Sequence, residues 1–122
     1  KVSKKITYAA ANNHPVVISK GILTHLNYDK MPVGKGEKLL PFSQFEILPD
    51  SNSTIYIYTD GYADQFGGIK GKKFKYKQLN ELLLNINHTP FINQQEVLSQ
   101  TFKNWQGDLE QVDDVCIVGI QV

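Results

Sequence analysis

The chain has 122 residues, of which 41% are hydrophobic and 20% charged, and its formal net charge is +1. These values are typical of a single globular domain, and the low net charge gives the whole molecule no electrostatic basis for binding nucleic acid or membranes. The single cysteine, Cys116, excludes an internal disulfide framework and a thiolate zinc cluster, and it indicates a reducing, cytoplasmic compartment. No apolar run approaches the roughly 20 residues of a transmembrane helix. The start of the sequence has no signal-peptide core. The chain also lacks an initiating Met, so we expect a processed or excised piece of a longer protein.

Short strands are predicted in the first half of the chain. We expect them over residues 5–11, 16–19, 22–26 and 45–49. The first alternates in the strand manner, with Ile6 and Tyr8 on one face. A tight connection at Lys20 and Gly21 joins the second strand to the third, so the first three are predicted to form a meander.

The second half combines two more strands with two helices. Residues 54–59 and 115–122 are apolar on both faces, which indicates strands covered on both sides. Two apolar stripes with helical spacing lie between them. Their residues are Leu79, Leu82, Leu83 and Ile86, then Leu98, Thr101, Phe102 and Trp105. For the second helix, Asn93 and Glu96 resemble a capping box and Gly107 a C-terminal cap. The order predicts an α+β layered fold of antiparallel strands, with helices on one sheet face.

Acidic residues stand at complementary ends of those two strands. Asp60 ends the first, and Asp113 and Asp114 precede the second. If the strands are antiparallel neighbours, these acids meet at one sheet edge, where a hard cation would offset their repulsion. Gly61 is expected to let the chain turn sharply after Asp60. Since no histidine pair has ligand spacing, oxygen ligands point to Mg²⁺ or Mn²⁺ rather than Zn²⁺. The alternative is purely structural, because Asp-Gly is a common turn and Asp often precedes a strand.

Several segments together resemble a known family. They are "AAANNHPVVIS", "MPVG", "IYIYTDGYADQFGG", "GKKFKYKQLNELL" and "GDLEQVDDVCIVGI". In this order they resemble the second half of the SpoIIE-type branch of metal-dependent protein serine/threonine phosphatases, the protein phosphatase 2C superfamily. The resemblance implies an α-β-β-α sandwich with a binuclear Mn²⁺ or Mg²⁺ centre at one rim. It also implies hydrolysis of phosphoserine or phosphothreonine by a metal-bridging water, in bacterial signal transduction.

The resemblance assigns roles to individual residues. Asp60 and Gly61 match the "(S/T)DG" motif, with Asp60 as a metal ligand, and Asp113 matches the ligand of the closing "D(D/N)" motif. Asp114 occupies the second position of that motif, where a direct ligand role is weaker. Asp64 matches an acid that serves a looser third metal. Cys116 stands where the family commonly has Thr, and we expect it to be a small buried packing residue.

One departure from the family pattern concerns the first metal motif. No "D-x-x-G-H-G"-like segment occurs in the 122 residues, so we expect residues 1–122 to be the C-terminal part of a single, incomplete phosphatase domain. Two carboxylates would hold a cation weakly, and we expect the isolated chain to be inactive and its parent to be the enzyme. We also expect the exposed apolar sheet to cause self-association. Partners implied by the family are a phosphorylated protein, such as an anti-sigma-factor antagonist, and upstream sensor or regulatory domains.

A lysine-rich segment, "KGKKFKYK" at residues 70–77, leaves alternatives open. Lys72, Lys73 and Lys75 would attract a phosphorylated substrate, or they form a solvated approach to the next helix. Two other functions compete with the phosphatase. One is a non-catalytic, degenerate interaction module, and the other is a basic nucleic-acid-binding domain.

Overall fold

The computed structural model describes residues 4–35 and 40–122. Its elements are, in chain order, β1 (Ile6–Tyr8), β2 (Val16–Ser19), β3 (Ile22–His25), β4 (Phe45–Ile47), β5 (Thr54–Tyr58), α1 (Gly61–Asp64), β6 (Phe66–Gly67), β7 (Lys72–Lys73), α2 (Tyr76–Ile86), α3 (Phe91–Gln106) and β8 (Ile117–Gln121). The chain forms two compact units, Lys1–Ile57 with Val118–Val122 and Tyr58–Ile117. In the described ranges, no helix has the length and apolar character needed to cross a membrane.

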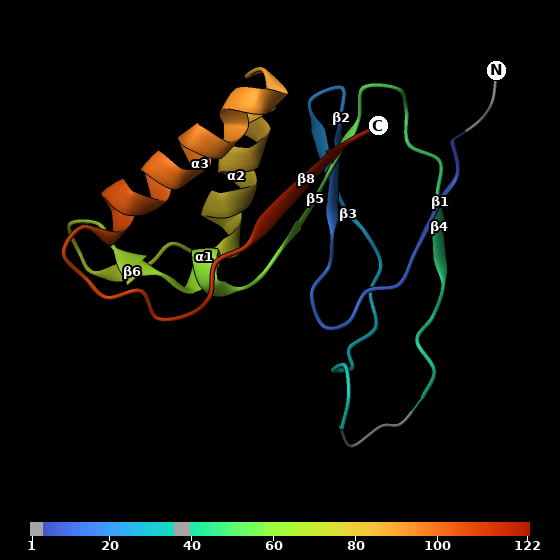
Figure 1. The fold of residues 1–122 in the computed structure, drawn as a ribbon, viewed down its shortest axis with the longest axis horizontal. Coiled ribbons are helices and arrows are strands. Elements are labelled where there is room, and N and C mark those ends of the chain that lie inside the picture. Colours follow the sequence, from blue (N-terminus) through green and yellow to red (C-terminus); the bar gives the residue numbers. More distant parts are fainter. Residues whose placement is uncertain (1–3, 36–39) are drawn as a thin grey trace. The chain divides into compact units, whose positions relative to one another are not determined.

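The first unit is built on a four-stranded sheet in the order β3-β2-β5-β8 (Figure 1). Strands β2 and β3 form the predicted hairpin, whose turn residues Lys20 and Gly21 both have positive φ, as a type I′ hairpin turn requires. Strand β8 runs antiparallel to β5, because Thr59 N–H donates to Cys116 O while Val122 N–H donates to Ser53 O. The sheet therefore confirms the predicted antiparallel arrangement and the α+β class.

The predicted meander of the first three strands is wrong in one respect. Strand β1 does not join β2 but pairs antiparallel with β4, with Ile6 opposite Ile47 and Tyr8 opposite Phe45. The Tyr8 and Phe45 rings pack with centroids 5.4 Å apart, and the Tyr8 hydroxyl donates to Asn27 O at 2.9 Å. Cross-strand aromatic pairs of this kind stabilise a pairing that local alternation cannot specify.

The second unit has an apolar core made by both helices and by α1. Helix α2 buries the predicted stripe residues Leu79, Leu83 and Ile86. Around α3, aromatic rings pack edge to face or tilted, with centroids 5.0 to 5.3 Å apart. These rings belong to Tyr62, Phe74, Phe102 and Trp105. The Tyr62 hydroxyl donates to Leu98 O at 2.8 Å, and burial raises the pKa of Tyr62. The spacing argument thus found both helices correctly.

The two ends of α3 give opposite outcomes for the capping predictions. The capping box at Asn93 and Glu96 is wrong, because α3 begins at Phe91 after Pro90 and has no side-chain cap hydrogen bond at that position. Gly107 does end the helix, with φ of 55° and its N–H donating to Lys103 O at 3.0 Å. A glycine tolerates this left-handed conformation without steric cost, which confirms the predicted C-terminal cap.

Candidate metal centre

The side chain of Thr59 joins two segments that are distant in sequence. Its hydroxyl donates to Asp114 O at 2.9 Å and accepts from Cys116 N–H at 3.0 Å, across 55 and 57 residues of chain. The backbone N–H of Thr59 also donates to Cys116 O at 3.0 Å. These three bonds hold the residue before Asp60 directly against the residue after Asp113. The structure therefore brings together the two segments that carry the predicted ligands.

Gly61 lies where a larger residue would not fit. It is the first residue of α1, and its φ is not positive. A Cβ added at this position would overlap the carbonyl group of Asp114 and lie 3.2 Å from Val115 Cγ2. The change from strand to helix at this point does not rest on a positive φ, and the close approach of the 114–115 backbone gives a further reason for glycine.

Asp60 and Asp113 both present their carboxylates to solvent. Asp60 precedes α1 with φ of −73°, and its backbone O accepts from Asp64 N–H at 2.9 Å. Within the described ranges its carboxylate makes no cap hydrogen bond and no ion pair. One carboxylate oxygen of Asp113 accepts from Asp114 N–H at 2.7 Å, and Gln111 Nε2 donates to Asp113 O at 2.8 Å. Asp60 and one oxygen of Asp113 are therefore free to accept another partner.

Asp64 is engaged by a lysine. Lys73 Nζ lies 3.2 Å from Asp64 Oδ1, so these two predicted functional residues neutralise each other. The pKa of Tyr76 is raised, first by burial and then by the negative charges of Asp60 and Asp64. The backbone N–H of Lys75 donates to Ala63 O at 2.7 Å, which places the start of α2 beside α1. Of the predicted substrate-attracting lysines, Lys72 and Lys75 are exposed without an ion pair among the described residues, whereas Lys73 is paired.

Cys116 differs from expectation, since its thiol is exposed rather than buried. Its backbone, not its side chain, makes the contacts with Thr59 described above. Packing therefore does not explain the residue at this position.

Gln65 is a residue that sequence reasoning missed. It is completely buried, and its Nε2 donates to Glu110 O at 2.8 Å and to Phe66 O at 3.0 Å. The backbone O of Gln65 accepts from Trp105 Nε1 at 2.9 Å and from Phe74 N–H at 2.9 Å. Gln65 thus ties the segment after α1 to the loop that leads to Asp113. No local pattern signals this role, because its partners lie far along the chain.

The donor set is too small to complete a metal site. Among residues 4–35 and 40–122, no group of three or more His, Cys, Asp or Glu is placed to hold a metal ion. Mg²⁺ requires about six oxygen ligands in octahedral geometry, and in proteins several of them are usually water. The acids of the described residues are therefore too few to complete a metal site by themselves, although the Asp60 carboxylate can supply one ligand.

A family model describes all of this chain. The model for Stage II sporulation protein E (SpoIIE) matches residues 1–122. The chain belongs to the SpoIIE family. This membership agrees with the order of motifs found in the sequence, from the "YTDG" strand end to the closing pair of aspartates.

A solved structure shows the same fold as this SpoIIE family member. The SiaA-PP2C domain of Pseudomonas aeruginosa superposes with a TM-score of 0.84 and 24% sequence identity, over 97% of this chain and 46% of that one. The chain thus spans about half the length of that structure, and its fold is that of part of a PP2C domain. No curated protein matches the sequence.

Proposed function

We propose that this chain is the C-terminal part of the catalytic domain of a metal-dependent phosphoserine/phosphothreonine protein phosphatase acting in bacterial signalling. The observation that carries the proposal is the connection made by Thr59 between the segments of Asp60 and Asp113. Two carboxylates from one rim then contribute to a Mn²⁺ or Mg²⁺ site, whose remaining ligands come from outside the described residues.

The residues of this chain have separate tasks in that centre. Asp60 and Asp113 supply oxygen ligands, and Thr59 with Gly61 keeps their segments in contact. When bound, the metal ions would activate water and offset the charge of the phosphate. Asp114 acts through its backbone carbonyl, which accepts from Thr59, so its side chain is not required.

The test compares aspartate variants of the intact protein that contains this chain. Asp60→Asn and Asp113→Asn are each expected to lower kcat/KM toward a phosphoserine peptide with Mn²⁺ by at least about a hundredfold, because each removes an anionic ligand. Asp114→Asn is expected to stay within about threefold of the wild type. Asp108→Asn is the matched control, since Asp108 is also exposed in the loop before Asp113 and has no hydrogen bond or ion pair in the described part of the chain.

Mn²⁺ binding distinguishes a phosphatase from a non-catalytic interaction module. Isothermal titration calorimetry of the intact protein with Mn²⁺ should show weaker binding by Asp60→Asn than by the wild type. Binding by Asp108→Asn should equal that of the wild type. If the intact protein neither binds Mn²⁺ nor hydrolyses the peptide, the chain is instead a non-catalytic interaction module. Activity of the 122-residue chain alone that exceeds that of its Asp60→Asn variant would contradict the claim that ligands from elsewhere are needed.

A further inference from the structure

The hairpin of β6 and β7 exposes an isoleucine at its tip. The turn Gly68–Gly71 connects the strands, with positive φ at both glycines and Gly71 N–H donating to Gly68 O at 3.3 Å. Between them, Ile69 has a relative exposure of 106%, so its side chain meets only solvent in this chain. Turn positions usually carry small or polar residues, and exposing Ile forgoes the gain from burying it. The Ile69 side chain is therefore fully available for contact with a partner.

The base of the hairpin is fixed to α3. Gly68 N–H donates to Trp105 O at 2.8 Å, and a Cβ at Gly68 would lie 2.7 Å from Trp105 Cζ3. A Cβ at Gly67 would overlap the Trp105 carbonyl. The indole Nε1 of Trp105 is bonded in turn to Gln65 O. The tip is thus presented by an ordered base, which reduces the entropy lost when a partner binds.

Unpaired lysines follow Ile69 in the sequence. Lys70 and Lys72 are exposed, and neither makes an ion pair within the described ranges. The same holds for Lys75 and Lys77 further along. Among the lysines of residues 70–77, only Lys73 has a carboxylate partner, Asp64, and its Nζ also lies 5.8 Å from the centroid of the Phe66 ring. We call Ile69, Lys70 and Lys72 the basic tip.

Lys73, the residue after the basic tip, contacts an acid of α1 near the candidate metal centre. The ion pair of Lys73 with Asp64 joins β7 to α1, directly after the motif of Asp60. The next element, α2, begins at Tyr76, which feels the charges of Asp60 and Asp64. The lysine-rich segment therefore runs from the exposed tip to the acids of the candidate centre.

We propose that the basic tip binds an acidic segment of the phosphoprotein substrate, beside the phosphorylated residue. Lys70 and Lys72 attract its carboxylates, and Ile69 contacts an apolar side chain in the same segment. Complementary charge mainly increases the association rate, while the apolar contact slows dissociation. This substrate preference rests on the proposed phosphatase function, and it explains both the unpaired lysines and the exposed isoleucine.

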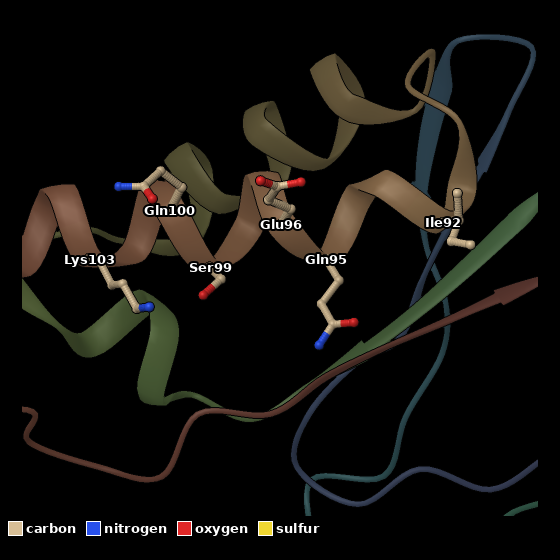
Figure 2. A pocket seen from close by; sticks show the side chains of 6 residues that line it. All are labelled: Ile92, Gln95, Glu96, Ser99, Gln100 and Lys103. Carbon is tan, nitrogen blue, oxygen red and sulfur yellow. The ribbon is translucent and has the colours of Figure 1, made fainter.

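A second exposed surface, on α3, provides the control for the basic tip. Figure 2 shows a pocket lined by α3 side chains, among which Gln95, Ser99 and Lys103 point to one side of the helix. Its lining also includes Ile92 and Glu96, so a carboxylate accompanies the lysine and no single charge dominates. Ile92→Ser and Lys103→Gln thus remove an exposed isoleucine and an unpaired lysine outside the basic tip.

The experiment measures peptide and small-substrate hydrolysis by the intact protein. The peptide carries phosphoserine flanked by Asp, Glu and Leu, and the small substrate is p-nitrophenyl phosphate. Two tip variants are tested, Ile69→Ser and the double variant Lys70→Gln/Lys72→Gln. Each is expected to lower kcat/KM for the peptide about five- to tenfold and to leave kcat/KM for p-nitrophenyl phosphate unchanged. The effect of the lysine variant should disappear for a peptide in which Lys replaces Asp and Glu. Equal losses in Ile92→Ser and Lys103→Gln would overturn the proposal.

A binding measurement separates the failure of this proposal from that of the phosphatase function. Binding of the labelled peptide is measured by fluorescence anisotropy in EDTA, where no hydrolysis occurs. The Kd of the tip variants should be about five- to tenfold higher than that of the wild type, similar to their loss of kcat/KM. Unchanged binding in these variants would refute the basic tip alone. Tighter binding of a single-stranded oligonucleotide, with a salt dependence lost in the lysine variant, would overturn the proposal in favour of a nucleic-acid partner.

Discussion

The hydroxyl of Thr59 offers a direct measure of how strongly the two acidic segments are held together. It makes two hydrogen bonds, to Asp114 O at 2.9 Å and from Cys116 N–H at 3.0 Å. Thr59→Val keeps the shape of the side chain and removes both bonds. Each such bond contributes about 1 kcal/mol net, so the free energy of unfolding should fall by about 2 kcal/mol. For a chain of this length that corresponds to a melting temperature lower by about 8 °C.

Thr59→Ser is the matched control for this prediction. It retains the hydroxyl and loses one half-buried methyl group, which should cost less than about 1 kcal/mol. Urea unfolding followed by the fluorescence of Trp105, the only tryptophan, reports on the same unit. The slope of the transition should be unchanged, because the exposed surface is the same. If valine and serine variants are equally stable, or if valine costs less than about 0.5 kcal/mol, the bridging role of Thr59 is refuted.

Three further predictions concern steric fit, pH and association. Gly61→Ala should lower stability by about 1 to 3 kcal/mol in thermal unfolding, since its methyl group meets the Asp114 carbonyl, and a variant as stable as the wild type would contradict this close approach. Burial and the neighbouring charge of His25 lower the pKa of His14, so the unfolded state binds its proton first as pH falls. The stabilising contribution of neutral His14 is therefore fully present above about pH 6.5 and is lost as pH falls through its pKa in the folded state. In His14→Gln, the free energy of unfolding should decline less steeply between neutral and mildly acidic pH. Parallel pH profiles of the variant and the wild type would show that His14 is not the cause. Exposed apolar residues on β5 and the edge strand β8 should make the 122-residue chain self-associate, so its light-scattering mass should rise with concentration and fall in a Val118→Thr/Ile120→Thr variant. A monomeric mass at all concentrations would refute the predicted self-association.

Local patterns were sufficient for the elements that bury a regular apolar face. The spacing of Leu79, Leu83 and Ile86 predicted α2, because a helix places these residues on one side. The Lys20-Gly21 turn and the apolar runs predicted the β2–β3 hairpin, β5 and β8. The expectation that β8 is covered on both sides is wrong for this chain, because Val118 and Ile120 are exposed. The order of motifs also indicated the family, because the glycines and acids at the strand ends are local features of the sequence.

Only the tertiary structure determined which segments meet. Strand β1 pairs with β4 instead of β2, and the β6–β7 hairpin is held by Trp105, more than thirty residues away in the sequence. Alternation reports which face of a strand is apolar, but it does not name the partner strand. The reason for Gly61 is likewise tertiary, because the atoms that exclude a side chain belong to Asp114. The sequence by itself therefore determined the acids of the candidate centre, and long-range hydrogen bonds through Thr59 decided that their segments lie side by side.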